Sequence, residues 1–144
     1  MKQLNTEGRY TVPAELKAAI DQEFWGDFAD DAITSATIDK VWKNFGYLCD
    51  TRTAVGWKVA EDYVAETGDR TPMVVLSTAS PYKFPAAVLS AIGGDTSGAE
   101  FEQMERLRAI TGVAIPGNLT GLKELPELHT GVIDKDEMLS FVLK

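Results

Sequence analysis

The chain has 144 residues and a mass of 15.7 kDa, the size of one ordinary domain. Hydrophobic residues make up 44% and charged residues 25%, so the chain is neither disordered, collagen-like nor a coiled coil. A net charge of -8 and a pI of about 4.6 disfavour binding to nucleic acid or to an acidic membrane surface. We therefore expect a single segment over residues 1–144 with one core, and neither nucleic acid nor membrane as a partner.

The chain contains one cysteine, Cys49, and one histidine, His129. An internal disulfide needs two cysteines, and a zinc site needs several cysteine or histidine ligands, so we expect neither. The first ten residues lack the apolar stretch of a secretion signal, and no run approaches the roughly 18 apolar residues of a membrane helix. The sequence therefore predicts a cytoplasmic protein without a metal.

Apolar residues recur at helical spacing in several segments that are bounded by residues typical of helix ends. Proline or aspartate opens some of these segments, and glycine closes others. The expected helices cover residues 13–25, the segment between Asp31 and Gly46, residues 53–67, 84–92 and 98–111, and a last helix that opens at Asp134–Glu137.

One short apolar run, Met73–Leu76, lacks polar alternation and is rich in β-branched residues. Such a run is typical of a strand buried on both faces of a parallel sheet, and Val113–Ile115 is a candidate for a second strand. One or two parallel strands cannot form a sheet by themselves. The predicted fold class is therefore α/β: a helix-rich fragment with one or two buried parallel-type strands, belonging to a larger sheet.

The segment Ser77–Lys83 follows the predicted strand directly, where open α/β sheets bind ligands. A purely structural interpretation, in which Ser80 and Pro81 open the next helix, explains the same residues equally well. Ser80 and Lys83 also match the S-x-x-K pattern of acyl-serine enzymes, but the companion motifs S-D-N and K-T-G are absent.

Asp50–Thr53 is the second candidate site, because a helix N-terminus and Arg52 together suit an anion. The alternative is a helix cap with a solvated arginine. Gly93–Gly98 follows a helix rather than a strand, which favours a flexible connection over a phosphate loop. His129 and the three tryptophans are interpreted as surface or packing residues.

Several signatures along the chain resemble the C-terminal part of threonine synthase. In chain order they are Phe24–Asp31, Thr37–Ile38, Gly46–Leu48, Asp50–Gly56, Ser77–Phe84 and Gly121–His129. Their common order is far more specific than any one of them.

The resemblance implies part of the large domain of a fold-type II pyridoxal 5'-phosphate enzyme, with a tryptophan-synthase-like fold. Such an enzyme converts O-phosphohomoserine and water to threonine and phosphate. The resemblance implies that Thr78 hydrogen-bonds the pyridine nitrogen of the cofactor, with Ser77 beside it as a second cofactor contact. A hydroxyl is a neutral partner, which orients the ring without keeping its nitrogen permanently protonated.

Two departures from the family pattern qualify this expectation. Arg52 stands where the family usually has histidine, although arginine still suits an anion contact. The family's Schiff-base lysine and glycine-rich phosphate loop belong to the N-terminal part, and no segment here matches them. We therefore expect no catalytic residue in this chain, no activity without the missing N-terminal part, and possible pairing of copies through an exposed sheet edge. The alternative is a noncatalytic module that binds another protein.

Overall fold

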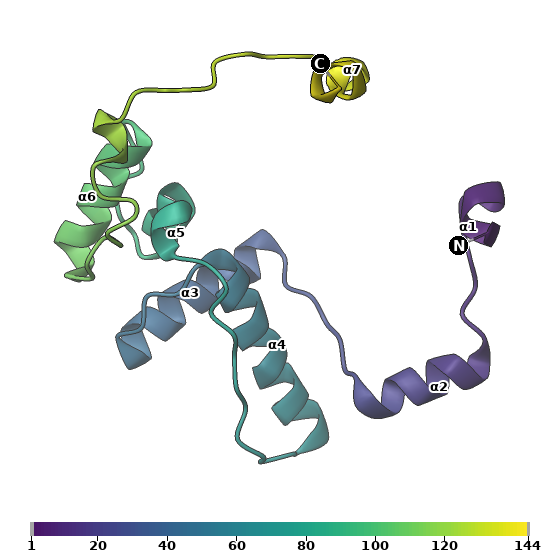
Figure 1. The fold of residues 1–144 in the computed structure, drawn as a ribbon. Helices are drawn as coiled ribbons and strands as arrows, with labels where there is room; N and C mark the ends of the chain where they lie inside the picture. Colours follow the sequence, from purple (N-terminus) through teal and green to yellow (C-terminus); the bar gives the residue numbers. More distant parts are fainter. Residues whose placement is uncertain (1, 144) are drawn as a thin grey trace. The chain divides into compact units, whose positions relative to one another are not determined.

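The structure of the chain is a computed structural model that describes residues 2–143. It divides into two compact units, Met1–Ala114 and Ile115–Lys144. The α-helices of the first unit are α1 (Lys2–Glu7), α2 (Ala14–Glu23), α3 (Asp31–Phe45), α4 (Thr51–Thr67), α5 (Pro85–Ala91) and α6 (Glu100–Thr111) (Figure 1). A short 3-10 helix, η1 (Pro81–Lys83), precedes α5.

The ends of α3 and α4 follow directly from the sequence. The Asp30 carboxylate accepts a hydrogen bond from the backbone N–H of Ile33 at 2.8 Å, which caps the start of α3. Gly46 and Gly68 end α3 and α4 in the left-handed conformation, with φ of 65° and 70°. Glycine adopts this conformation without a Cβ clash, so both helices stop where the sequence predicts.

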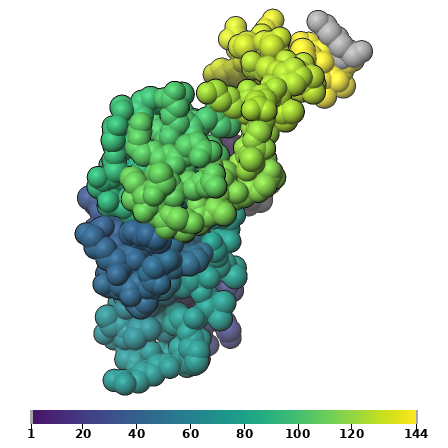
Figure 2. All heavy atoms as spheres, turned by 90° about the vertical axis from the view of Figure 1, so that its left-hand side faces the viewer, coloured from purple at the N-terminus to yellow at the C-terminus, as the bar shows by residue number. Residues whose placement is uncertain are grey.

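The core of the first unit lies among α3, α4, α5 and α6. Helix α3 packs against both α4 and α5, and α5 packs against α6. Figure 2 shows the blue atoms of α3 with the teal atoms of the α4 region on one side and green atoms on the other. The innermost side chains are Ile38, Val41, Val88, Leu89 and Leu107, all at most 1% exposed. Burying an aliphatic side chain of this size stabilises a fold by about 1.5–3 kcal/mol.

The predicted strands are wrong, because no residue between 2 and 143 is in a β-strand. Met73–Leu76 has no regular secondary structure, and Val74 and Leu76 are 85% and 74% exposed rather than buried. A strand requires a neighbouring backbone, and no described segment pairs with this one. The apolar run indicated only that these side chains favour burial. It did not show that a neighbouring strand is present to supply the backbone hydrogen bonds.

Val113–Ile115 is likewise without regular structure, although the Val113 carbonyl accepts a hydrogen bond from the Tyr82 hydroxyl. The α/β fold class therefore does not hold for this chain, whose described residues form helices and irregular segments. The expected pairing of copies through a sheet edge loses its basis with the sheet.

The second unit contains η2 (Leu122–Glu124), η3 (Lys135–Glu137) and α7 (Met138–Val142). The backbone N–H of Asp134 donates to the Glu137 carboxylate at 3.3 Å, so the last helical segment opens where the sequence predicts. Across residues 2–143, no helix combines the length and the apolar character that a membrane crossing requires.

Candidate functional site

The structure brings the two candidate segments of the sequence together. The hydroxyl oxygens of Ser77 and Thr53 lie 3.5 Å apart, at the outer limit of a hydrogen bond. Thr53 is in the first turn of α4, and Ser77 belongs to the irregular segment that follows Met73–Leu76. Residues separated by 24 positions in the sequence thus form one site at the N-terminus of α4.

Asp50 anchors this end of α4. Its carboxyl group is fully buried, caps the helix by accepting a hydrogen bond from the backbone N–H of Arg52 at 3.0 Å, and accepts a second from the Thr53 hydroxyl. A buried carboxyl without partners would be strongly unfavourable, so these two bonds fix both side chains. The cap expected of Asp50 is therefore present.

Tyr47 completes the cluster from the loop between α3 and α4. Its hydroxyl donates to the Ser77 hydroxyl oxygen at 3.0 Å. Cys49 lies between Tyr47 and Asp50 in the sequence and is fully buried. Burial, with the nearby Asp50 charge as a smaller cause, raises the pKa of its thiol to about 11. Cys49 is therefore a packing residue rather than a reactive thiol.

Arg52 lies on the same turn of α4, with its guanidinium 5.6 Å from the ring centroid of Phe84. This is the distance of a cation–π contact, and the side chain remains exposed. The arginine therefore stands next to the end of the Ser77–Lys83 segment, as an anion contact at that segment requires. Its role toward an anion stays a prediction.

Thr78 is exposed, and its hydroxyl makes no hydrogen bond to any residue within 2–143. The hydroxyl is therefore available to a ligand, unlike that of its neighbour Ser77. Ser80 opens η1 by accepting a hydrogen bond from the backbone N–H of Tyr82 at 3.2 Å. The acyl-serine interpretation requires a hydrogen bond between the Ser80 hydroxyl and the Lys83 side chain. Within the described residues no such bond is present.

Two apolar grooves run between α4 and residues 73–76. One, of about 540 Å³, is lined by Trp57, Ala60, Val64, Met73 and Val75 among others. The other, of about 460 Å³, is lined by Trp25, Val59, Tyr63, Val74 and Leu76 among others. Two of the three tryptophans pack on aromatic rings as expected, Trp25 edge-on to Tyr63 and Trp57 against Phe45, and each of these two also borders a groove.

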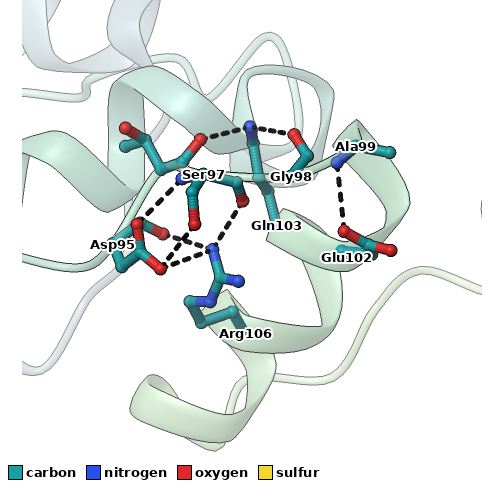
Figure 3. Close-up of polar contacts among 8 residues, drawn as sticks. Asp95, Ser97, Gly98, Ala99, Glu102, Gln103 and Arg106 are labelled. Carbon is teal, nitrogen blue, oxygen red and sulfur yellow. Dashed lines mark hydrogen bonds and ion pairs between the residues drawn. The ribbon is translucent and has the colours of Figure 1, made fainter.

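The glycine-rich segment Gly93–Gly98 is tied to α6 (Figure 3). The Gln103 amide donates to the carbonyls of Thr96 and Gly98, and Arg106 donates to the carbonyls of Asp95 and Ser97. These bonds hold a segment that the sequence suggested to be a flexible connection. They occupy carbonyl groups and do not form the set of N–H groups that a phosphate needs.

His129 is exposed in the second unit. Within residues 2–143, no three His, Cys, Asp or Glu side chains are grouped so as to hold a metal ion.

Sequence reasoning missed Tyr47 and the pairing of Asp50 with Thr53. Both belong to segments that carry the family resemblance, but nothing in their spacing connects them to Ser77. Asp50, Thr51 and Thr53 lie just before and within the first turn of α4, and polar residues at such positions usually cap a helix. This pattern could have indicated the pairing of Asp50 with Thr53. Only the packed structure adds the contact with Ser77.

Comparison with known proteins identifies the family. The family described as "Threonine synthase, C-terminal" matches residues 53–140, more than half of the chain. The chain is 35% identical over 107 residues to threonine synthase of Methylobacillus glycogenes, and 31% identical over 98 residues to that of Saccharomyces cerevisiae. These matches cover 74% and 65% of this chain but only 18% and 19% of the relatives, so the chain spans less than a fifth of their length.

A solved structure gives the same result. The crystal structure of threonine synthase from Brucella melitensis with bound pyridoxal phosphate matches with a TM-score of 0.61 and 36% identity. The match covers 74% of this chain and 23% of that one. The resemblance carried by the signatures from Phe24 to His129 is thereby confirmed: the chain belongs to the threonine synthase C-terminal family.

Proposed function

We propose that this chain is the C-terminal segment of a threonine synthase, which converts O-phosphohomoserine and water to threonine and phosphate with pyridoxal 5'-phosphate. The family match and the 36% identity to a pyridoxal-phosphate-bound threonine synthase support this assignment. The single cysteine, a buried free thiol, is compatible with a cytoplasmic enzyme.

The observation that carries the proposal is the exposed, unpartnered hydroxyl of Thr78 beside the fixed hydroxyl of Ser77. A hydroxyl that bonds no described residue fits the ring nitrogen of the cofactor, and Ser77 offers a second polar group next to it. When bound, pyridoxal phosphate supplies an electron sink for the carbon chemistry. Thr78 orients the ring and, as a neutral group, does not hold a proton permanently on the ring nitrogen.

In this proposal the chain contributes only the contacts to the pyridine ring of the cofactor. The family resemblance assigns the Schiff-base lysine and the phosphate-binding loop to the N-terminal part of the enzyme. Thr78 cannot take the place of either, because the phosphate group of the cofactor needs several N–H donors and its aldehyde carbon needs an amine nucleophile. We therefore expect the chain by itself to be inactive.

The apolar grooves beside α4 support the proposal that the N-terminal part of the enzyme binds this chain. Val74 and Leu76 are largely exposed where they line one of them, and exposed apolar surface is reduced when another part of a protein covers it. A noncatalytic module that binds another protein is the second candidate, favoured by the same surface. A concentration-independent monomer that binds no hydrophobic dye would count against this candidate.

The test measures phosphate release from O-phosphohomoserine with pyridoxal phosphate in excess. The chain alone should release none above the cofactor background. The completed enzyme, in which this chain replaces the matching segment of the Methylobacillus glycogenes relative, should release phosphate and form threonine. Inactivity of the completed enzyme would contradict the proposed function, and activity of the chain alone would contradict the proposed division of roles.

Thr78→Val in the completed enzyme should weaken cofactor binding. Thr130→Val is the matched control, since Thr130 is also exposed and its hydroxyl bonds no described residue. Equal cofactor affinity in both variants would remove the role assigned to Thr78.

A further inference from the structure

The segment that carries Thr78 has very few polar ties. Across residues 73–79, the only hydrogen bonds to other described residues are the two made by the Ser77 hydroxyl. No helix or strand includes this segment. Whatever fixes the position of Ser77 therefore fixes the backbone next to Thr78.

Tyr47 and Thr53 hold Ser77 from two sides. The Tyr47 hydroxyl donates to the Ser77 oxygen at 3.0 Å, and the Thr53 oxygen lies 3.5 Å away. A hydroxyl has a single proton, and that of Thr53 is directed to the Asp50 carboxyl group. The Thr53 oxygen therefore accepts the proton of the Ser77 hydroxyl. Each hydroxyl then donates once: Tyr47 to Ser77, Ser77 to Thr53, and Thr53 to Asp50.

The far end of this chain of bonds is rigid. Asp50 is fully buried and caps α4, a helix of 17 residues, and Thr53 is buried in its first turn. Side chains fixed by burial and by a second set of hydrogen bonds hold a neighbouring group more precisely than exposed ones do.

We propose that Asp50, Thr53 and Tyr47 are positioning residues for the cofactor: they hold Ser77, and through the shared peptide bond they orient the Thr78 hydroxyl toward the pyridine ring of pyridoxal phosphate. This inference rests on the proposed function. The proposed role of these three residues needs no contact between them and the cofactor. Their effect is transmitted through Ser77: Tyr47 and Thr53 make its only hydrogen bonds to described residues, and Asp50 acts by holding Thr53.

The experiment measures cofactor affinity and the absorption maximum of bound pyridoxal phosphate in the completed enzyme. Tyr47→Phe and Thr53→Val each remove one tie to Ser77 while keeping the shape of the side chain. We expect each to weaken cofactor binding roughly fivefold and to shift the absorption maximum in the same direction as Thr78→Val. Thr53→Ser keeps the hydroxyl and should restore both properties.

Matched controls separate positioning from general destabilisation. Tyr10→Phe removes an exposed phenol hydroxyl elsewhere in the chain, and Thr34→Val removes a buried threonine hydroxyl from α3. Both should bind the cofactor like the parent protein. The thermal midpoint of every variant is measured without cofactor, so that a loss of fold is recognised.

The outcomes distinguish this inference from the proposed function. If Thr78→Val weakens cofactor binding and Tyr47→Phe and Thr53→Val leave it unchanged, the inference is overturned and the proposed function stands. If the affinity falls only in proportion to the thermal midpoint, with no spectral shift, the residues are merely structural and the inference is also wrong. If Thr78→Val binds the cofactor normally, the role of Thr78 and this inference fail while the family-based assignment of the chain stands. If the completed enzyme binds no cofactor, the proposed function fails as well.

Discussion

The side-chain amide of Gln103 donates a hydrogen bond to the backbone carbonyl of Thr96 at 2.7 Å. The same nitrogen donates to the carbonyl of Gly98 at 3.1 Å, so a side chain of α6 fixes two points of the preceding loop (Figure 3). Gln103 is buried, and its amide oxygen has no hydrogen-bond partner within the described residues. The two carbonyls therefore determine that nitrogen, not oxygen, faces the loop.

Gln103→Glu should destabilise the first unit by about 1–3 kcal/mol at neutral pH, because an acceptor replaces the donor that faces two carbonyls. Protonation of the introduced carboxyl group restores one donor, so the deficit should shrink as the pH is lowered toward about 5. Urea unfolding at both pH values measures the effect. Gln22→Glu, on the exposed face of α2, is the control and should change little. A deficit that does not depend on pH would contradict this explanation.

The Asp95 carboxylate should stabilise the fold at neutral pH and lose this effect in acid. The backbone N–H of Ser97, the Ser97 hydroxyl and the nearby Arg106 charge hold the pKa of the Asp95 carboxyl below its usual 3.8. A carboxyl whose pKa is lower in the folded state stabilises the fold above the unfolded pKa, and this contribution is lost as the pH falls below it.

Asp95→Asn should therefore lower the thermal midpoint at neutral pH and make it less sensitive to acidification toward about pH 2.5. Asp136→Asn is the control, since the Asp136 carboxylate accepts no hydrogen bond from the described residues. Parallel pH profiles for the parent and Asp95→Asn would show that the contacts seen in Figure 3 add nothing to stability.

Gly94→Ala should destabilise the first unit by about 1–3 kcal/mol through overpacking. A Cβ at this position would lie 2.7 Å from a methyl carbon of Leu89 and 3.2 Å from one of Ile110. Leu89 is fully buried, so it has no free space into which to move. Gly26→Ala is the control, because no atom lies within 4 Å of the added Cβ. Chemical unfolding of both variants tests the difference, and equal stability would mean that the core around α5 is looser than described.

Cys49 should resist alkylation in the folded protein. Its thiol is fully buried, and with a pKa of about 11 only about one molecule in a thousand is a thiolate at about pH 8. Mass spectrometry after iodoacetamide treatment should show no adduct until denaturant unfolds the chain, when every molecule reacts. Rapid labelling without denaturant would contradict the burial of Cys49.

The sequence predicted helices α2 to α6 closely, because their boundaries are encoded locally. Asp30 and Asp50 cap α3 and α4, and Gly46, Gly68 and Gly112 end α3, α4 and α6 with positive φ. A capping side chain or a glycine acts within one helical turn, so its effect follows from the residues beside it. Helix α1 was not predicted, since its six residues bury no side chain and show no apolar stripe.

The strand at Met73–Leu76 was wrong for the opposite reason. Apolar and β-branched residues indicate a preference for burial, whereas a strand also requires a neighbour that supplies its hydrogen bonds. That neighbour is a property of the whole fold, and the described residues provide none.

The sequence by itself determined the helix ends, the family resemblance and the two candidate segments Asp50–Thr53 and Ser77–Lys83. Only the tertiary structure decided that these segments meet, with Ser77 between Tyr47 and Thr53 while Thr78 stays unpartnered. Local preferences act between residues a few positions apart. A contact across 24 positions depends on how α4 and the segment after it pack, which no periodicity in the sequence specifies.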